Sequence, residues 1–340
     1  MSTAIVILNW NGSTYLQQFL PVLIKHTTLP GVDIIVADNA STDSSLKVLE
    51  EEFPAIRTIV LDKNYGFAGG YNKAFQQIEA DYYVLLNSDV EVTENWLEPL
   101  IRFMDENKLV GACQPKILSY LQRNCFEHAG AAGGYIDRFG FPFCRGRILG
   151  IAEEEKGQYD SIVDVFWATG ACLFIRSEVY WTVGGMDDEF FAHMEEIDLC
   201  WRMRSRGYRI VCIPESSVYH VGGGALNYES PHKTYLNFRN NLLLLYKNLP
   251  NKQLENILNW RFVFDYAAAL QLFVTGKPKN ALSVMKARKD FKNMMPGFEE
   301  KRKQNILHAT CEIIPEIFQK SIVLEYYLKG KKTFSSLVGK

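Results

Sequence analysis

The stretch LLNSDVEV, residues 85–92, runs from an apolar segment directly into a cluster of amide and carboxylate groups. The apolar segment begins at Tyr82, and it predicts a buried strand over residues 82–86. Asn87, Asp89 and Glu91 then follow, separated only by Ser88 and Val90. A strand that ends in this way brings oxygen ligands to one edge of a sheet, so its place in the fold decides what they can bind.

The residues before this stretch alternate between strand and helix patterns. Apolar runs predict strands over residues 4–8, 33–37, 57–61 and 82–86, with helices over 15–27, 44–53 and 69–79 between them. Residues 41–43, Ser-Thr-Asp, are expected to cap the second helix. This βαβαβαβ order predicts an α/β fold with a parallel, doubly wound sheet, in which ligands bind beyond the carboxyl ends of the strands.

Polar clusters follow all four predicted strands. They are NWNG, DNAS, NYGF and NSD in chain order, and they include Asn9, Asp38, Asn64 and Asn87. Such residues are ordinary in turns, but four clusters along one sheet edge predict a binding site. For Asp38 an Asx turn is favoured over a hydrogen bond from the ring NH of uracil or thymine.

The run GFAGGYN, residues 66–72, is the nearest match to a phosphate-binding loop. Its glycines, beginning with Gly66, let backbone amides approach an anion or a base at a helix start, and Asn72 ends the run. Tight packing explains such glycines equally well. The first turn lacks GxGxxG and the chain lacks GxxxxGK[ST], which argues against dinucleotide cofactors and P-loop hydrolases.

Asp89 is the strongest candidate for a metal ligand. A DxD-like motif can be matched at the strand end in two registers, Asn87-Ser88-Asp89 and Asp89-Val90-Glu91, and Asp89 belongs to both. Oxygen ligands of this kind suit Mg²⁺ or Mn²⁺, which usually share their coordination with phosphates. The alternative is a solvated acidic turn.

The composition is that of a folded chain with a basic C-terminal region. Of the 340 residues 47% are apolar and 13% aromatic, which excludes a disordered chain. The net charge of -2 divides into +8 over residues 276–340, with 14 Lys and Arg against 6 Asp and Glu, and -10 before them. Beside the aromatic residues of 260–273, this region predicts either contact with an anionic membrane surface or a solvated helical face. No nucleic-acid motif accompanies the charge, so nucleic acid is not an expected partner.

The cysteines and the apolar runs indicate in which cellular compartment the protein is expected. Seven cysteines without a CxxC pair argue against a disulfide framework or a structural zinc site. The start of the chain lacks the basic flank and length of a signal peptide, and the longest apolar run, 262–274, is shorter than the roughly 20 residues that cross a bilayer. We expect a cytoplasmic protein, with peripheral contact at the inner face of the cell membrane as a further possibility.

An ordered series of motifs over residues 4 to about 225 resembles the family 2 glycosyltransferases of the GT-A fold. The matching stretches are ILNWNG, VADNASTDSS, NYGFAGGYNKA, LLNSDVEV, WATGACLFIRSE, GGMDDEFFAHMEEIDLCWRMRSRGY and PESSVYHVGGG. The closest likeness is to the bacterial branch with rhamnosyl- and galactofuranosyltransferases. This resemblance implies a GT-A domain over residues 1–228 and a helical extension over 229–340.

The resemblance also implies a reaction. It is inverting transfer of a sugar, rhamnose first and galactofuranose next, from a dTDP- or UDP-sugar to a cell-surface polysaccharide or a lipid-linked glycan. Mg²⁺ or Mn²⁺ would assist. The family's metal motif often begins with aspartate where this chain has Asn87, which rests the metal mainly on Asp89 and on ligands from elsewhere.

MEEIDLCWRMRSRG, residues 194–207, predicts a helix with Glu195 and Glu196 in its first turn. Acids at this position complement the helix dipole, which is the structural alternative. Glycosyl transfer needs a carboxylate that takes the proton from the acceptor hydroxyl. The resemblance places this base at Glu196, with Glu195 and Asp198 as neighbours that orient the substrate or hold the helix start.

Four further features complete the expected site. His220 is a lone histidine beside glycines, for which a structural role is the alternative, and the resemblance makes it a second metal ligand. Trp167 offers an aromatic face for a sugar ring, or is an ordinary core tryptophan. Residues 222–224 are expected to form a loop that closes over the donor, and the glycine-rich segment 125–150 to shape the sugar or acceptor pocket.

Two other functional classes stay open at this point. A noncatalytic nucleotide-sugar or glycan-binding protein could keep the fold, although it would not need acids at both Asp89 and Glu196. A nucleotidyltransferase shares the α/β start, but it would need a basic glycine-rich loop where NWNG stands. The retained acids favour a transferase.

Overall fold

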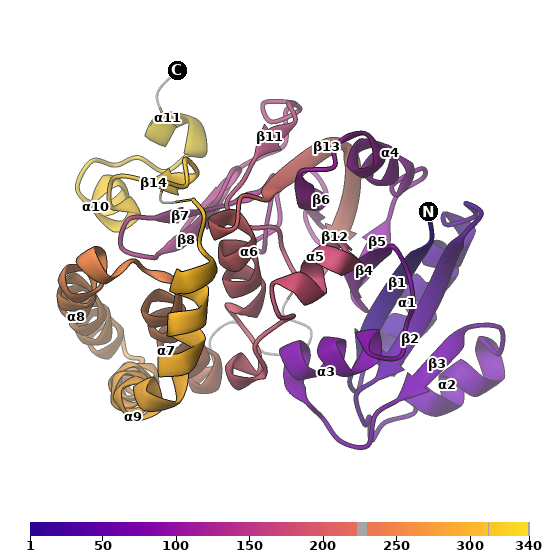
Figure 1. Cartoon of the computed structure of the whole chain (residues 1–340), viewed down its shortest axis with the longest axis horizontal. Helices are drawn as coiled ribbons and strands as arrows, with labels where there is room; N and C mark the ends of the chain where they lie inside the picture. The colour runs from indigo at the N-terminus through magenta and orange to yellow at the C-terminus, as the bar shows by residue number, and fades with distance from the viewer. Residues whose placement is uncertain (223–229, 312, 339–340) are drawn as a thin grey trace.

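The computed structural model describes residues 1–222, 230–311 and 313–338, and its centre is a large mixed sheet (Figure 1). The strand order is β11-β13-β6-β12-β4-β1-β2-β3, and β5 pairs with β13. The first four strands are β1 (Thr3–Asn9), β2 (Val32–Asp38), β3 (Arg57–Val60) and β4 (Tyr82–Asn87). They pair in parallel, which confirms the predicted sheet.

The helices between these strands cover both faces of the sheet, because the strand side chains alternate. Ile5 and Ile7 of β1 pack with apolar residues of α1 (Ser13–Lys25) and α2 (Ser45–Glu52). Ala4 and Val6 instead belong to the cluster that contains Tyr71 and Phe75 of α3 (Gly66–Phe75). The sheet is therefore doubly wound, as the alternation of strand and helix patterns predicts.

The second half of the sheet introduces antiparallel strands. β12 (Cys172–Arg176) runs antiparallel to both β4 and β6 (Val110–Ser119), whereas β13 (Arg209–His220) runs parallel to β6. The short strands β5 (Val90–Val92) and β11 (Val163–Asp164) both pair with β13 in the antiparallel sense. The remaining elements here are α4 (Glu98–Glu106), α5 (Ser177–Thr182), the 3₁₀ helix η1 (Asp188–Phe190) and α6 (Glu195–Ser205).

The segment 125–150 does not form an irregular loop. It contributes β7 (Gly134–Asp137), β8 (Pro142–Cys144) and β9 (Arg147–Ile148) to a smaller sheet that also contains β10 (Ile151–Ala152) and β14 (Ile317–Phe318). β14 comes from the C-terminal region and pairs in parallel with β7. The extension predicted as helical therefore includes a strand.

Three long helices dominate the C-terminal region (Figure 1). They are α7 (Pro231–Asn248), α8 (Asn251–Val274) and α9 (Pro278–His308), followed by the short α10 (Ile322–Tyr327) and α11 (Phe334–Val338). Leu242 to Leu245 of α7 and Phe291 and Phe298 of α9 join the same hydrophobic core as α3 and α6. The predicted boundary at 228 lies outside the described residues, and among those described no helix is long and apolar enough to cross a membrane.

Candidate active site

The end of β4 and the end of β13 bring Asp89 and His220 together. Asp89 Oδ1 lies 3.1 Å from His220 Nε2, and Asn87 Nδ2 lies 3.4 Å from the same nitrogen. β13 supplies this contact because its last residues pair with β5, His220 opposite Val90. Both Asp89 and His220 are buried. The structure thus unites the two predicted metal ligands, which are 131 positions apart in the chain.

Glu127 supports the other side of the histidine ring. Its Oε2 lies 3.3 Å from His220 Nδ1, and it is also buried. Burial opposes the charged imidazole, but Asp89 and Glu127 raise the pKa of His220 to about 10. The pKa of Glu127 is in turn held near 2, where His220 and backbone amides outweigh burial. The ring therefore sits between two carboxylates.

These residues fit a divalent cation, which would displace the proton that Nε2 of His220 carries while the ring lies between the two carboxylates. A histidine whose second nitrogen faces a carboxylate is the usual arrangement around a bound metal, because that contact fixes the ring and its tautomer. Asp89 and His220 offer one oxygen and one nitrogen ligand on the same side. Within residues 1–222, 230–311 and 313–338, no three His, Cys, Asp or Glu side chains gather into a set that could hold a metal by themselves. A cation here would complete its coordination with groups from a bound ligand.

Asn9 and Asp38 lie side by side at the ends of β1 and β2. Asn9 Nδ2 donates to Asp38 Oδ2 at 3.0 Å, and the backbone NH of Ser41 donates to Asp38 Oδ1 at 2.9 Å. The second bond closes the turn after β2, but it spans three residues and is therefore not the two-residue Asx turn that the sequence predicts. Both oxygens of the fully buried Asp38 are already bonded, so its predicted contact with a base would require this turn to rearrange.

The clusters after β2 and β3 form one hydrogen-bonded unit. Asn39 Nδ2 donates to Asn64 Oδ1 at 3.1 Å and to the carbonyl of Gly66 at 3.0 Å, and Asn64 Oδ1 accepts from the backbone NH of Gly66 at 2.8 Å. Gly66 has φ +71°, and a Cβ there would lie 2.5 Å from the ring and the carbonyl oxygen of Phe191. Only glycine allows this approach, which brings the loop before α6 against the start of α3.

Glu195 and Glu196 open α6 after a strained segment. Phe191, His193 and Met194 have φ values of 65°, 71° and 75°, a region that bulky L residues rarely adopt. The backbone NH of Phe67 donates to the carbonyl of Phe191 at 2.6 Å. Such strain is kept where neighbouring contacts enforce it, and it often marks functional sites. Here it directs the first turn of α6 toward the glycine-rich start of α3.

Asn240 of α7 holds this segment in place through contacts with its backbone. Its Nδ2 lies 2.9 Å from the carbonyl oxygens of Phe190 and Ala192 and 2.8 Å from that of His193. The side chain is fully buried. An amide group buried among three backbone carbonyls fixes the path of the loop, and so fixes where Glu196 points.

The two glutamates differ in environment. Glu195 is buried, and burial together with the charge of Glu196 raises its pKa well above the usual value. Burial raises the pKa of the partly exposed Glu196 to about 7. Oε2 of each residue is buried and has no hydrogen-bond partner in the part of the chain that the structure describes. Neighbouring acids whose environments separate their pKa values can divide the neutral and charged roles between them.

Asp198 does not belong to this pair. It is fully buried, and it accepts from Arg202 Nε at 3.0 Å, Lys247 Nζ at 2.7 Å and Asn248 Nδ2 at 2.8 Å. These cations lower its pKa although burial opposes ionisation. These contacts lie within α6 or join α6 to α7. They favour the role of Asp198 in holding the helix start, and its role in orienting the substrate stays a prediction.

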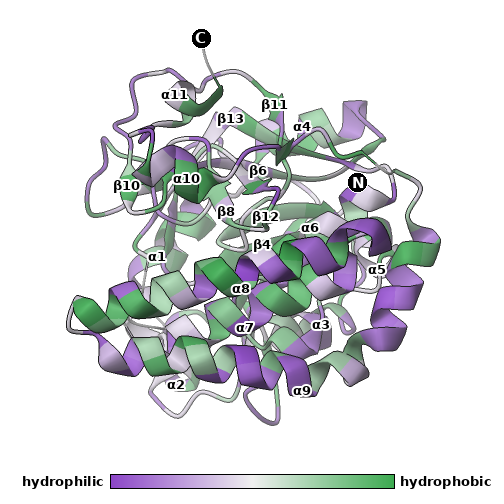
Figure 2. Cartoon of the chain, turned by 90° about the vertical axis from the view of Figure 1, so that its left-hand side faces the viewer, coloured by the Kyte–Doolittle hydropathy of each residue, from purple (hydrophilic) through white to green (hydrophobic). Residues whose placement is uncertain are grey.

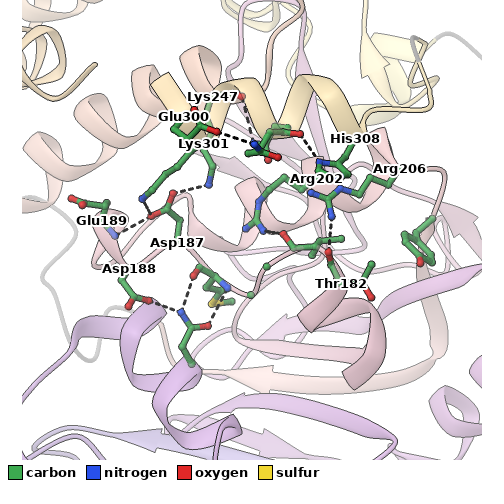
Figure 3. Close-up of a pocket in the computed structure, with 18 residues that line it drawn as sticks. Thr182, Asp187, Asp188, Glu189, Arg202, Arg206, Lys247, Glu300, Lys301 and His308 are labelled. Atoms are coloured by element: carbon green, nitrogen blue, oxygen red, sulfur yellow. Dashed lines mark hydrogen bonds and ion pairs between the residues drawn. The ribbon is translucent and has the colours of Figure 1, made fainter. Parts of the chain in front are cut away.

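A cavity lies beside this ion-pair network and not at the paired glutamates (Figure 3). Its volume is about 1030 Å³, and it is lined by charged residues of α6, α7, α9 and the loop after α5. Asp187 in its wall accepts from Lys247 at 2.7 Å and from Lys301 at 2.6 Å (Figure 3). The cavity is not lined by Asp89, His220, Glu195 or Glu196. We therefore do not assign the chemistry to it.

Two residues predicted to bind the nucleotide sugar, Asn72 and Trp167, form hydrogen bonds within the protein. Asn72 Nδ2 donates to the carbonyl of Met186 at 2.8 Å, and its Oδ1 accepts from the backbone NH of Met186 at 3.1 Å. Trp167 is buried, donates from Nε1 to the carbonyl of Tyr135 at 2.9 Å, and covers Gly134. Trp167 is thus the core tryptophan of the alternative interpretation. The loop expected at 222–224 lies mostly outside the described residues.

The sequence analysis did not identify Glu127 or Asn240. Glu127 precedes the small sheet and reaches His220 only because β6 and β13 are neighbours in the sheet, which no spacing reveals. Asn240 carries a signal that could have been read. Two consecutive amides, Asn240 and Asn241, stand next to four leucines in α7, and buried amides in an apolar helix need defined partners.

Comparison with known sequences gives one family and several relatives. Residues 4–149 match the family described as glycosyl transferase family 2. An N-acetylglucosaminyl-diphospho-decaprenol L-rhamnosyltransferase of Mycobacterium tuberculosis is 24% identical over 230 residues, which cover 64% of this chain and 75% of that protein. The dTDP-rhamnosyl transferase RfbF of Shigella flexneri is 25% identical over 229 residues, covering 63% of this chain and 71% of that protein.

Comparison with solved structures supports the fold. S. aureus TarS 1-349 in complex with UDP-GlcNAc superposes with a TM-score of 0.57 at 16% identity, covering 91% of this chain and 89% of that one. GalNAc-T7 with UDP, GalNAc and Mn²⁺ gives a TM-score of 0.58 at 16% identity, covering 90% of this chain and 57% of that one. At such identities these likenesses concern the fold.

Proposed function

We propose that this chain, a family 2 glycosyltransferase of the GT-A fold with rhamnosyltransferases among its relatives, transfers a sugar with inversion from a dTDP- or UDP-sugar to an acceptor hydroxyl. Rhamnose is the first candidate sugar, since two of its relatives are named for it. The acceptor would be a cell-surface polysaccharide or a lipid-linked glycan. The name of the mycobacterial relative, which contains a diphospho-decaprenol, supports the lipid-linked form.

The state of Glu196 carries this proposal. Its carboxylate is partly exposed and has a pKa of about 7, and one of its oxygens has no hydrogen-bond partner among the described residues. A general base works best when its pKa lies near the working pH. A protein that only binds a sugar nucleotide has no need of a strained loop and a buried asparagine to hold such a base.

The proposed chemistry is a single displacement with Glu196 as the base. Glu196 takes the proton of the acceptor hydroxyl while that oxygen forms a bond to the anomeric carbon. The bond from that carbon to the diphosphate oxygen breaks on the opposite face, so a single displacement inverts the anomeric centre. Glu195, with its raised pKa, stays protonated beside Glu196 and leaves the negative charge on the base.

The leaving diphosphate would face the ends of β4 and β13. Asp89 and His220 would hold Mg²⁺ or Mn²⁺ there together with the diphosphate, and the cation would neutralise the charge that develops on the leaving group. Asn87 lies beside His220 Nε2 and would contribute an amide in place of a second carboxylate. Asn9, Asn64 and Gly66 form the adjoining edge where a nucleoside would lie.

The test is a donor screen by mass spectrometry. Release of nucleoside diphosphate from UDP- and dTDP-sugars, with rhamnose and galactofuranose among them, is followed with and without Mn²⁺ for the wild type, Glu196→Gln and Asp89→Ala. We expect one donor to turn over with metal and both variants to lose that turnover. If no donor reacts while one binds equally to wild type and Glu196→Gln, the chain is a binding protein and the proposal is wrong.

A further inference from the structure

The helix α8 has its charged and apolar sides reversed relative to an ordinary surface helix. Its buried positions include Arg261 and Asp265, which are 1% and 0% exposed. Its outer side carries large apolar residues instead, and Phe273 and Val274 are 64% and 75% exposed. Figure 2 shows this side, with α8 in front of α7 and apolar colour gathered toward the C-terminal end of α8. A helix in water normally places these two classes of residue the other way round.

The exposed apolar residues form one continuous stripe. Val263, Leu270 and Val274 are separated by seven and four positions, and Phe262 and Phe273 by eleven, which are spacings of one helix face. The stripe continues onto α9, where Leu282 is 65% exposed. Residues of both helices also line an apolar groove of about 370 Å³. A connected apolar surface of this kind usually has a partner.

The charges on the inner side fix α8 to the body of the protein. Arg261 Nε lies 3.2 Å from Asp265 Oδ1, and Asp265 also pairs with Arg288 of α9. Arg261 Nη1 donates to the carbonyl of Phe139 at 3.2 Å. Because these charges are paired inside, α8 is held in a defined orientation, and the apolar stripe is a fixed surface.

Basic residues border the stripe. Residues 277–292 contain six Lys and Arg and one acid, Asp290. Lys279, Lys289 and Lys292 of this segment are exposed. A symmetric pair of chains joined through the stripe would bring these lysines near their own copies, which disfavours a second copy as the partner. An anionic surface with an apolar interior matches both the charge and the stripe.

We propose that α8 and the first half of α9 dock on a bilayer that contains anionic lipids, with the stripe inserted at the level of the headgroups and the lysines of α9 facing lipid phosphates. The helices would lie in the plane of the surface. This proposal goes beyond glycosyl transfer and does not depend on the identity of the donor.

The experiment is vesicle flotation with the full chain. Vesicles of phosphatidylcholine alone are compared with vesicles of phosphatidylcholine and phosphatidylglycerol. We expect binding to the mixed vesicles, and roughly fivefold weaker binding for each exposed lysine removed, measured with Lys279→Ala and Lys289→Ala. Phe273→Ser combined with Val274→Ser should weaken binding at least roughly tenfold, because both side chains would leave the apolar layer.

The matched control is Val60→Ser combined with Leu109→Ser. These two apolar residues are 60% and 70% exposed, which is close to the exposure of the tested pair, and they lie on β3 and before β6, away from the C-terminal helices. The control should bind like the wild type. Equal loss in both double variants, no binding of the wild type to mixed vesicles, or a dimer that Phe273→Ser with Val274→Ser converts to a monomer in sedimentation would each overturn the proposal.

Discussion

Replacing Glu196 with glutamine should remove activity and make the protein more stable at high pH. Burial raises the pKa of Glu196 from 4.5 to about 7, so the folded chain holds this proton more tightly than the unfolded chain. Ionisation therefore costs no folding free energy below pH 4.5, an increasing amount up to about pH 7, and a constant amount above it. Glutamine has the same size and no charge, so it escapes this cost.

The interval from 4.5 to about 7, at about 1.36 kcal/mol for each pH unit, gives about 3 kcal/mol as an upper value. Because the side chain is partly exposed, solvent screening reduces it, and we expect a gain of about 1 to 3 kcal/mol at about pH 8. The gain should fall close to zero at about pH 4.5.

Urea unfolding followed by tryptophan fluorescence at both pH values measures this gain. Glu50→Gln, an exposed change on α2, serves as the control and should leave the free energy of unfolding unchanged at both. Nucleoside diphosphate release by Glu196→Gln should fall by on the order of 100-fold or more, and wild-type turnover should rise with pH through about 7. A Glu196→Gln protein that is less stable than wild type at about pH 8 would refute the reasoning, since it would mean that the carboxylate has a stabilising partner.

Three other substitutions separate the supporting residues from the base. Asp198→Asn should lower the free energy of unfolding, measured with urea, by about 3 to 5 kcal/mol, because it leaves buried cations uncompensated. Turnover per folded molecule should be unchanged. Lost turnover at full stability would indicate a catalytic role for Asp198. Asn240→Ala should cost about 2 kcal/mol and slow turnover on the order of 100-fold, whereas Asn305→Ala, which also removes buried amide bonds, should affect stability alone. Equal turnover in these two alanine variants would contradict a role for Asn240 in placing the base. Glu127→Gln should weaken Mn²⁺ binding about 10- to 100-fold in titrations with UDP present, and unchanged affinity would show that Glu127 does not orient His220.

Local patterns in the sequence predicted the first half of the fold and the ends of its strands. Apolar runs and helical spacing place β1 to β4 within one or two residues of their observed bounds. The pairing of Asp89 with His220 came from the resemblance and not from spacing, since nothing local connects positions 131 apart. Periodicity predicts whether a residue faces the core or the solvent, but it does not predict which distant residue it contacts.

Local patterns left alternatives open where long-range partners decide the role of a residue. Asp198 and Glu196 occupy the same first turn of α6, and only the approach of Lys247 and Asn248 from α7 makes one of them structural. Trp167 was equally open between two roles until the fold placed it over Gly134. The C-terminal region carries no motif, so its strand β14 and its contact with β7 could not be predicted.

The dependence of the loop before α6 on α7 bears on how fragments of this protein can be used. The segment that matches the family ends at residue 149, and Glu196 and its support lie beyond it. A fragment cut at 228 would contain the base but would lack Asn240, Lys247 and Asn248, which hold the loop and α6 in place. During synthesis, likewise, Glu196 cannot reach its final position until α7 has left the ribosome and packed against the loop. A fragment that is to be expressed, or exchanged with the matching part of a relative, must therefore extend beyond residue 248.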